Sequence, residues 1–418
     1  MLPLVTLGRH CCSLATNLEN YRSFVGDEMT DEIRDLAQRL KGIRICHLNA
    51  TSTGGGVAEL LTRYIPLLRA LGIKADWHLI HGEPEFFIVT KRIHNALQGA
   101  GYELTDAMRV TYLDANAQAA KMLESDYDAF VVHDPQPAAI RHYAGARSAK
   151  WIWRCHIDSS SPNPQVSTFI LPLIREYDAL VFTMREFALP GLDDMPLAII
   201  PPAIDPLATK NTEIPLDLCK HVIADAGVNL KARILLQVSR FDPWKDPMGV
   251  IDAYHLVKNE IPGVQLVLIA GMAADDPEGW GILDQVQEVA ARDEDLYVFT
   301  NLGGVGSMEV NVFQRGCDVV IQKSLREGFG LVVAEAFWKE RPVVAGRAGG
   351  IPMQFPAGYE ANLVESVEAC AQRVTALLRD SEQREAFGRA GREHVRASFL
   401  LPRLLRDDLR LIQELVGG

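Results

Sequence analysis

Cysteine is sparse in this sequence of 418 residues, and no two of its seven cysteines form a Cys-x-x-Cys pair. Without paired spacings, the chain matches neither a disulfide-rich scaffold nor a cysteine-ligated zinc site. Scattered reduced thiols are typical of the cytoplasm, so we expect a cytoplasmic protein. The cysteines are Cys11, Cys12, Cys46, Cys155, Cys219, Cys317 and Cys370.

Long apolar runs are also missing. No stretch approaches the roughly 18 residues of a membrane-spanning helix, and residues 1–7 lack the basic leader and cleavage pattern of a signal peptide. The formal net charge of −12 argues against nucleic acids and anionic membranes as partners. We therefore expect small molecules as the main partners, and the sequence leaves a homodimer open.

Several catalytic signatures have no match. The sequence contains neither a His-Glu-x-x-His motif nor a Gly-x-Ser-x-Gly turn. Two histidines three positions apart, His78 and His81, would point to opposite faces of a strand. We therefore expect no metal site and no serine nucleophile of this kind.

The sequence does contain an alternation of short apolar runs and helical patterns. Its hydrophobic content of 48% is that of a soluble globular protein, and its length exceeds that of one ordinary core. The alternation predicts an α/β protein with two doubly wound domains, separated at a stiff, proline-rich junction at residues 201–206. The first helix is expected at residues 30–41, with Thr30 as its N-cap. Strands are expected at residues 43–48, 74–80, 129–132, 150–155, 179–183, 198–200, 233–238, 264–270, 296–299, 318–321 and 341–345.

A glycine-rich loop follows the first predicted strand. Gly54, Gly55 and Gly56 stand between this strand and an apolar-periodic helix. Strand, glycine-rich loop and helix are typical of the opening of a nucleotide-binding domain. The loop matches neither Gly-x-Gly-x-x-Gly nor Gly-x-x-x-x-Gly-Lys-Ser/Thr, which argues against a dinucleotide or P-loop enzyme.

Polar side chains follow two predicted strands of the first domain. Asp134 and Gln136 follow one strand, and His156, Asp158 and Asn163 follow the next. Adjacent strand ends of a parallel sheet can converge, and ligands bind there. The alternatives are that His156 is a satisfied core or turn histidine and that Asp134 caps the following helix.

Two cations lie in the loop after the first strand of the second domain. Arg240 can bind two oxygens with its forked guanidinium, and Lys245, five positions on, can act as a point charge. Such a loop suits a diphosphate. The alternative is a solvated loop, the usual environment of these residue types.

Residues 322–335 contain Glu327 and Glu335, with a Gly-Phe-Gly turn between them. The two glycines let the backbone approach a ligand closely. Free N–H groups at the start of the helix expected at residues 331–338 favour an anion. From these residues alone, an ordinary strand–turn–helix connection is an equal alternative.

Taken together, the triple glycine, His156, Arg240 with Lys245, and Glu327 with Glu335 resemble the retaining glycosyltransferases of family 4. The resemblance covers nearly the whole chain. It implies the GT-B fold, in which two Rossmann-like, doubly wound domains face a central cleft and the C-terminal helix returns to the first domain. It is most specific for the trehalose-forming branch, which contains glycosyltransferring trehalose synthases and retaining trehalose phosphorylases. The segments that carry this finer likeness are residues 57–59, 133–137, 153–158, 201–206, 240–245 and 275–280.

The resemblance implies how the domains divide the substrates. Residues 1–205, with the helix at about 400–418, would bind the acceptor, and residues 206–399 would bind the donor. The acceptor-binding residues would be Asp134, Gln136, Asp158 and Asn163.

The resemblance also implies roles at the donor. Arg240 and Lys245 would hold the diphosphate as it leaves, Glu327 would bind the glucosyl hydroxyls, and Glu335 the ribose hydroxyls. His156 would contact the donor sugar near its C6 hydroxyl and the reacting centre. The expected catalytic residues are therefore His156, Arg240, Lys245 and Glu327. Backbone groups that complete the donor site would be those of Gly54, Gly55, Gly56, Gly328, Phe329, Gly330 and Leu331.

The activity implied is reversible transfer of glucose from a nucleoside diphosphate glucose, such as UDP-glucose or ADP-glucose, to free glucose, giving α,α-trehalose. Front-face attack with retention needs positioning and electrostatic stabilisation rather than a protein nucleophile. It requires no metal and no cofactor beyond the nucleotide-sugar co-substrate. The alternatives are a trehalose phosphorylase using glucose 1-phosphate, a GT-B sugar-nucleotide epimerase and an inactive sugar-binding module. One departure from the family pattern is Ala361, where a glycine is usual.

Overall fold

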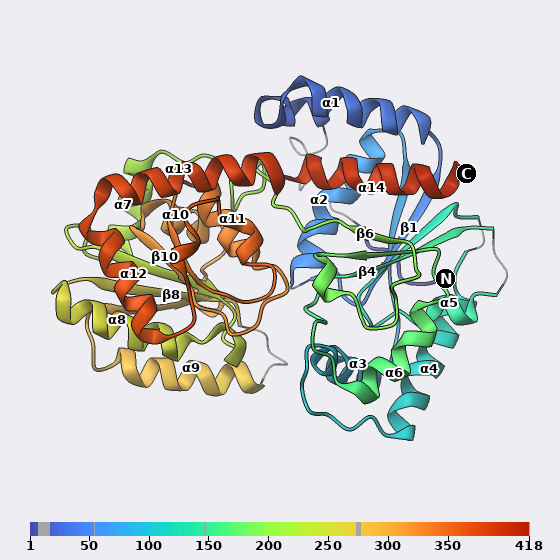
Figure 1. Ribbon diagram of the computed structural model, residues 1–418, viewed down its shortest axis with the longest axis horizontal. Coiled ribbons are helices and arrows are strands. Elements are labelled where there is room, and N and C mark those ends of the chain that lie inside the picture. The colour runs from blue at the N-terminus through green and yellow to red at the C-terminus, as the bar shows by residue number, and fades with distance from the viewer. Residues whose placement is uncertain (7–16, 54, 125, 146–147, 273–276, 418) are drawn as a thin grey trace. The chain divides into compact units, whose positions relative to one another are not determined.

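The computed structural model describes residues 1–6, 17–53, 55–124, 126–145, 148–272 and 277–417, which form two compact units (Figure 1). The first unit comprises Met1–Ala203 and Leu401–Gly418, and the second comprises Ile204–Leu400. The division falls within the proline-rich junction, a stiff segment of the kind that separates domains.

The first unit is built on a parallel sheet of six strands in the order β2-β1-β3-β4-β5-β6. A parallel sheet is covered on both faces, so its strands consist of nearly continuous apolar runs. Accordingly, β3 (Ala129–His133) and β5 (Ala179–Phe182) are buried at every position. The other strands are β1 (Arg44–Asn49), β2 (Lys74–Leu79), β4 (Lys150–Cys155) and β6 (Leu197–Ile199).

Helices cover this sheet. Helix α1 lies along α14 on one side, and α3, α4 and α6 lie on the other (Figure 1). The helices are α1 (Arg22–Arg39), α2 (Gly56–Ala70), α3 (Pro84–Leu97), α4 (Asp106–Lys121), α5 (Ile140–Tyr143), α6 (Pro164–Ile174) and α14 (Leu401–Val416).

The second unit contains another parallel sheet of six strands, in the order β12-β11-β10-β7-β8-β9. Its strands are β7 (Ile234–Ser239), β8 (Gln265–Ala270), β9 (Leu296–Thr300), β10 (Val319–Gln322), β11 (Val343–Gly346) and β12 (Leu363–Val364). Its helices are α7 (Leu216–Asp225), α8 (Pro247–Glu260), α9 (Pro277–Ala290), α10 (Ser307–Gly316), α11 (Leu331–Trp338), α12 (Val367–Arg379) and α13 (Ser381–Ser398). Two doubly wound parallel sheets confirm the predicted fold class.

Each sheet has one point at which the chain reverses the direction in which it adds strands. In the first unit this point lies between β1 and β3, and in the second it lies between β7 and β10. The carboxyl ends of strands at such a reversal are the preferred ligand position in open α/β sheets. The topology therefore directs attention to the loops after β1, β3, β7 and β10.

Helix α14 belongs to the first unit, which confirms that the C-terminal helix returns to it. One anchor of α14 is a buried ion pair, in which Arg154 Nη1 on β4 lies 2.8 Å from both carboxylate oxygens of Asp408. Arg403 also donates from Nη2 to the carbonyl oxygens of Pro201 (2.8 Å) and Pro202 (3.0 Å). These bonds satisfy charges that would otherwise be buried without partners.

The prediction for the first helix is wrong at its start. Helix α1 begins at Arg22, and Thr30 lies inside it rather than at its N-cap. The backbone breaks at Gly26, where φ is +81°. The Thr30 hydroxyl then donates to the Gly26 carbonyl oxygen at 2.7 Å, four residues back, instead of capping a helix start.

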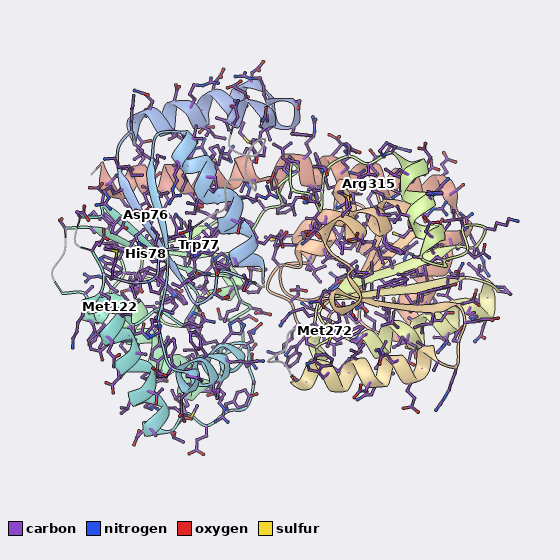
Figure 2. The ribbon with its side chains drawn as sticks, turned by 180° about the vertical axis from the view of Figure 1, so that it is seen from behind. Asp76, Trp77, His78, Met122, Met272 and Arg315 are labelled. Carbon is purple, nitrogen blue, oxygen red and sulfur yellow. The ribbon has the colours of Figure 1, made fainter. Side chains whose placement is uncertain are left out.

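The edge of the first sheet holds its polar side chains by internal hydrogen bonds. Trp77 on β2 donates from Nε1 to Asn49 Oδ1 at the end of β1 (2.7 Å). His78 lies next to Trp77 (Figure 2). Its two ring nitrogens lie 3.1 Å from the Leu2 carbonyl oxygen and 3.1 Å from the Tyr127 hydroxyl. His78 therefore has a structural environment that accounts for both nitrogens.

Two further findings concern the whole described chain. Within the residues that the structure describes, no helix combines the length and the apolar character needed to cross a membrane. Five cysteines are buried free thiols, and Cys11 and Cys12 lie outside the described residues.

Candidate active site

Side chains of β7 and of the loop after it position Lys245. Asp242 Oδ1 accepts a hydrogen bond from the Lys245 amide (3.1 Å), and Gln237 Nε2 donates to the Lys245 carbonyl oxygen (2.9 Å). The side chain of Arg240 is more than half exposed, and its Nη2 lies 3.3 Å from Asp242 Oδ2. The loop therefore holds both cations at the carboxyl edge of the sheet, where the topology favours a ligand.

Lys245 and Glu327 form one ion pair. Lys245 Nζ lies 2.6 Å from Glu327 Oε2, and the two side chains are only 16% and 11% exposed. Ser324 Oγ lies 3.4 Å from the same oxygen. The sequence predicted separate roles for these residues, whereas in the described chain each holds the other in place.

The turn after Glu327 is tightly packed. Gly330 is the N-cap of α11 and has φ +80°. Gly350 donates to the Gly328 carbonyl oxygen at 3.2 Å, and a Cβ on Gly350 would lie 2.7 Å from that oxygen. Gln354 Nε2 donates to the Phe329 carbonyl oxygen. The turn is therefore rigid, and it leads into the first turn of α11, whose N–H groups have no acceptor within the helix.

Glu335 lies on α11 and is only 2% exposed. Its Oε1 lies 3.3 Å from Lys210 Nζ, whereas its Oε2 is buried and has no hydrogen-bond partner among the described residues. Lys339, one turn further on, donates to the Glu335 carbonyl oxygen at 3.0 Å. Burial lowers the pKa of Lys339 to about 7, against the opposing effect of the Glu335 charge. The bare Oε2 is an acceptor that a ligand hydroxyl could satisfy.

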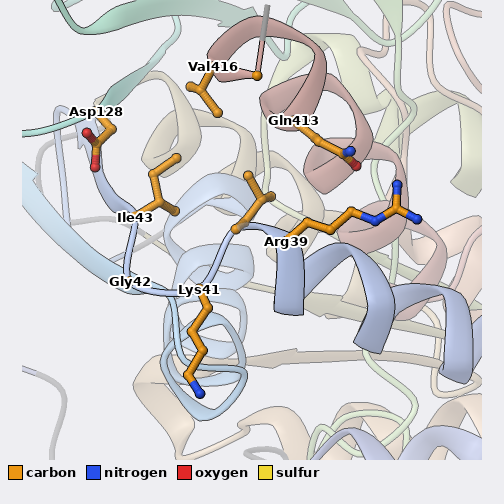
Figure 3. Close-up of a pocket in the computed structure, with 9 residues that line it drawn as sticks. Arg39, Lys41, Gly42, Ile43, Asp128, Gln413 and Val416 are labelled. Atoms are coloured by element: carbon orange, nitrogen blue, oxygen red, sulfur yellow. The ribbon is translucent and has the colours of Figure 1, made fainter.

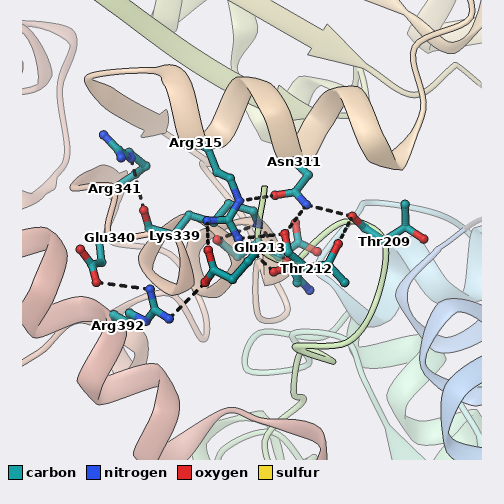
Figure 4. Close-up of polar contacts among 11 residues, drawn as sticks. Thr209, Thr212, Glu213, Asn311, Arg315, Lys339, Glu340, Arg341 and Arg392 are labelled. Carbon is teal, nitrogen blue, oxygen red and sulfur yellow. Dashed lines mark hydrogen bonds and ion pairs between the residues drawn. The ribbon is translucent and has the colours of Figure 1, made fainter. Parts of the chain in front are cut away.

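The segment around Lys210 is fixed by a polar network (Figure 4). Asn311 Nδ2 donates to the carbonyl oxygens of Thr209 (2.9 Å) and Thr212 (2.8 Å), and Arg315 Nη2 donates to the latter at 2.9 Å. Because these bonds come from α10, they hold the cation that reaches Glu335.

In the first unit, Asp134 and His156 lie at adjacent strand ends. Asp134 Oδ1 accepts a hydrogen bond from the His156 amide (2.8 Å), and the Asp134 amide donates to the Arg154 carbonyl oxygen (2.8 Å). Asp134 has φ +63°, a conformation that Asp tolerates better than most residues. Burial raises the pKa of its carboxyl to about 7, and the hydrogen bond from His156 opposes the rise. Asp134 is therefore not the N-cap of the following helix, because its carboxylate bridges two strands instead.

Three histidines form a row behind this edge. His47 Nδ1 lies 3.1 Å from His133 Nε2, and His133 Nδ1 lies 2.9 Å from His156 Nε2. The three rings lie end to end with nearly parallel planes, and their centroids are 5.4 and 5.3 Å apart. Burial, with the nearby Arg154 cation, lowers the pKa of His47 to about 3. Burial also holds the pKa values of His133 and His156 well below the usual range.

The other predicted acceptor residues are largely engaged within the chain. Asp158 Oδ1 accepts from the Ser160 amide (3.0 Å) and hydroxyl (2.6 Å). Asn163 caps α6, accepting from the Gln165 amide, and its Nδ2 donates to the Tyr102 carbonyl oxygen (3.1 Å). Gln136 is half-buried. Asn163 is therefore a loop-shaping residue in this structure, and the contribution of the other two to an acceptor site stays a prediction.

The glycine-rich loop is described in part. Gly54 lies outside the described residues, so its predicted role stays a prediction. Gly55 is the N-cap of α2 with φ +89°, and Gly56 is the first residue of that helix. Both therefore lie where the connection from β1 enters α2, and β1 borders the topological reversal of the first sheet.

Among the described residues, no three or more His, Cys, Asp or Glu side chains are placed so that they could hold a metal ion together. A pocket of about 460 Å³ lies elsewhere in the first unit, at the amino end of β1 (Figure 3). It contains none of the predicted site residues and is lined by Arg39, Leu40, Lys41, Gly42, Ile43, Asp128, Gln413, Val416 and Gly417. Because ligands of α/β sheets bind at the opposite, carboxyl ends of strands, this pocket is separate from the candidate site.

Sequence reasoning missed three residues of these arrangements. The sequence could have indicated His47 and the ring of His133, because a polar side chain within a buried parallel strand must find a hydrogen-bond partner. Nothing in the sequence indicates Lys210, since it is one cation in a polar stretch.

Comparison with known proteins places the chain in a class. A family model described as the N-terminal domain of trehalose synthase matches residues 47–189, and one described as glycosyl transferases group 1 matches residues 221–394. The crystal structure of an α,α-trehalose 6-phosphate synthase from Burkholderia multivorans has the same fold, with a TM-score of 0.68 at 16% identity over 90% of this chain and 99% of that one. The architecture is that of the GT-B glycosyltransferases.

The sequence relatives identify the family more narrowly. A trehalose synthase from Rubrobacter xylanophilus is 52% identical over 405 residues, which cover 96% of this chain and 97% of the relative. A trehalose phosphorylase from Grifola frondosa is 27% identical over 435 residues, which cover 91% of this chain and 59% of that relative. The chain belongs to the trehalose synthase family of glycosyltransferases.

Proposed function

We propose that the chain transfers the glucosyl group of a nucleoside diphosphate glucose to free glucose with retention, giving α,α-trehalose. The bond between the glucosyl C1 and the diphosphate oxygen breaks, and a bond from C1 to the anomeric oxygen of the acceptor forms on the same face. The acceptor proton passes to the leaving phosphate, so the second product is the nucleoside diphosphate. Membership of the trehalose synthase family supports the product.

The observation that carries the choice of donor is the bare oxygen of Glu335. This oxygen is buried, lacks a hydrogen-bond partner among the described residues and belongs to a carboxylate held by Lys210. A buried acceptor without a donor is costly unless a ligand supplies one. A ribose offers two neighbouring hydroxyl donors for such a carboxylate, so the site favours a nucleotide sugar.

The remaining donor groups suit a diphosphate. Arg240, Lys245 and the first turn of α11 bring positive charge to the same edge of the sheet, where it can stabilise the leaving group as negative charge develops. Lys245 is also paired with Glu327, so it orients the carboxylate that we assign to the glucosyl hydroxyls. These groups can neutralise charge that a divalent cation neutralises in other enzymes.

We assign acceptor binding to the first unit. Asp134 and His156 are joined at the ends of β3 and β4, beside the half-buried Gln136. His156 itself we assign to the donor sugar near its C6 hydroxyl, because one of its ring nitrogens is engaged by His133, which leaves the other for an oxygen of that sugar. Asp158 shapes the adjacent loop through its bonds to Ser160.

Phosphorolysis is the second candidate, because the chain is also similar to a trehalose phosphorylase. The two reactions are separated by supplying UDP-, ADP- or GDP-glucose with glucose, or glucose 1-phosphate with glucose, and detecting trehalose by NMR. Maltose as the only sugar tests isomerisation, and a nucleotide sugar without acceptor tests epimerisation. We expect α,α-trehalose from at least one nucleotide sugar. Trehalose from glucose 1-phosphate or maltose alone would overturn the proposal, and nucleotide binding without turnover would indicate an inactive sugar-binding module.

Two variants connect the activity to the site. Glu335→Gln should weaken binding of the nucleotide sugar about 10-fold, because a charged acceptor becomes neutral, and Lys245→Met should abolish transfer. Glu288→Gln is the control, since it removes an exposed carboxylate of α9 that pairs with Arg292. Full activity in Lys245→Met would remove the diphosphate assignment.

A further inference from the structure

The histidine row of the first unit limits where protons can lie. The low pKa values that burial imposes make His47, His133 and His156 neutral near pH 7. A neutral imidazole has one N–H donor and one bare acceptor nitrogen. His133 uses both of its nitrogens within the row, so it donates to one neighbour and accepts from the other.

Only two arrangements satisfy both bonds. In the first, His47 Nδ1–H donates to His133 Nε2, and His133 Nδ1–H donates to His156 Nε2. The proton of His156 then lies on Nδ1, and His47 Nε2 is bare. In the second arrangement both bonds are reversed, so His156 Nδ1 is bare and His47 Nε2 carries a proton.

The far end of the row distinguishes the two. His47 Nε2 is buried and has no hydrogen-bond partner in the described part of the chain. An N–H group buried without an acceptor is rarer in native proteins than an acceptor whose capacity is unused. The first arrangement, with a bare His47 Nε2, is therefore the favoured one.

We propose that His133 and His47 are positioning residues that hold His156 in the tautomer with its proton on Nδ1, so that His156 presents an N–H donor to an oxygen of the bound sugar substrate. The inference rests on the proposed function, in which His156 contacts the substrate. The Asp134 carboxylate holds the backbone of the same residue, so the main chain and the ring of His156 are fixed independently.

His78 shows what a purely structural histidine looks like in this sheet. Both of its nitrogens are matched by a carbonyl oxygen and a hydroxyl of the same unit. The row instead ends at the half-buried His156, whose Nδ1 makes no hydrogen bond to the described residues. An oriented nitrogen left open at a strand end indicates a ligand-binding role rather than a packing role.

The test combines four variants of the full chain, one of them for signal assignment only, with a direct measurement of the tautomer. His133→Leu removes the bond to His156. His133→Asn keeps an N–H donor near the Nδ1 position, and His47→Phe removes only the far bond. Long-range ¹H–¹⁵N spectra of protein labelled with ¹⁵N-histidine report which ring nitrogen of each histidine carries the proton. The signal of His156 is identified as the one that disappears in the His156→Gln variant. Steady-state kinetics of trehalose formation are measured on the same samples.

We expect the wild type and His133→Asn to show His156 protonated on Nδ1, and His133→Leu to show a mixture of tautomers. We expect kcat to fall about 10- to 100-fold in His133→Leu with a smaller change in KM, since one oriented hydrogen bond is lost in the transition state. His133→Asn should restore most of the activity, and His47→Phe should be intermediate.

A wild-type His156 protonated on Nε2, or a His133→Leu tautomer identical to the wild type, would overturn the inference. If His133→Leu does not fold, His47→Phe decides by the same measurements. The spectra need no substrate, so a wrong function would leave the tautomer intact, whereas a wrong inference would leave trehalose synthesis from the nucleotide sugar intact.

Discussion

Replacement of Gly330 by alanine tests whether the position of Glu327 matters for transfer. Gly330 has φ +80°, and a Cβ at this position would lie 3.1 Å from Glu327 Cγ and 3.3 Å from Ile351 Cγ1. Such distances are tighter than ordinary van der Waals contact, so Glu327 must move by a few tenths of an ångström. Its partner, Lys245 Nζ, lies 2.6 Å away, so the movement disturbs the ion pair directly.

The stability cost can be separated from the effect on the site. An alanine in left-handed backbone costs about 1 to 2 kcal/mol, which lowers the melting temperature of a unit of this size by about 2 to 8 °C. Gly263, in the loop before β8, also has φ +80°, and a Cβ there would meet no atom within 4 Å. Gly263→Ala should therefore reproduce the strain of Gly330→Ala without touching the site.

The assay compares the two variants by thermal unfolding and by initial rates of trehalose formation. We expect similar losses of melting temperature, but a fall in kcat of about 10- to 100-fold only in Gly330→Ala, since small misplacements of binding groups are costly in catalysis. Equal activity of the two folded variants would refute the reasoning, because it would show that transfer does not depend on where Glu327 lies.

Three further predictions concern buried charges. The carboxyl of Asp134 has a folded pKa of about 7, above its ordinary value, so the folded state holds a proton that the unfolded chain has lost, and stability falls as the pH rises from about 4 to 7. Asp134→Asn should remove that fall of about 4 kcal/mol, as followed by urea unfolding at several pH values, and identical profiles would contradict it. The pH dependence of stability is opposite for Lys339, because its folded pKa of about 7 lies below its ordinary value. Stability should rise from about pH 7 to 10, and Lys339→Met should flatten this rise, whereas an unchanged slope would exclude a buried neutral amine. Arg154→Met should cost about 3 to 5 kcal/mol by leaving Asp408 buried and unpaired, and adding Asp408→Leu should recover most of it. If Arg154→Met alone lost less unfolding free energy than the double variant, the ion pair would not behave as a buried one.

The elements of this chain were largely predictable, because they depend on local patterns. Helix α11 (Leu331–Trp338) and strand β4 (Lys150–Cys155) have the predicted bounds, since each is a compact apolar run between polar turns. Helix α4 (Asp106–Lys121) was not predicted. It is rich in alanine and polar residues and shows little apolar periodicity, so tertiary packing rather than pattern sustains it.

The candidate site was predictable as a set of residue types, but not as an arrangement. The motifs around Arg240, Lys245 and Glu327 indicate phosphate and sugar binding, because cations and carboxylates at strand ends suit those ligands. The ion pair between Lys245 and Glu327 joins residues 82 positions apart, and no local pattern encodes such a distance. The same limit applies to His47, which is 86 positions from His133.

The sequence by itself determined the α/β class, the trehalose-forming resemblance and the side chains available for chemistry, because apolar periodicity and motif spacing are properties of neighbouring residues. Only the tertiary structure decided how those side chains are used. Glu335 becomes a buried carboxylate with one bare oxygen because α11 packs against the segment of Lys210. His156 acquires an oriented ring because the sheet places β1, β3 and β4 side by side. Burial and hydrogen-bond direction, which set these properties, arise only when strands distant in sequence become neighbours.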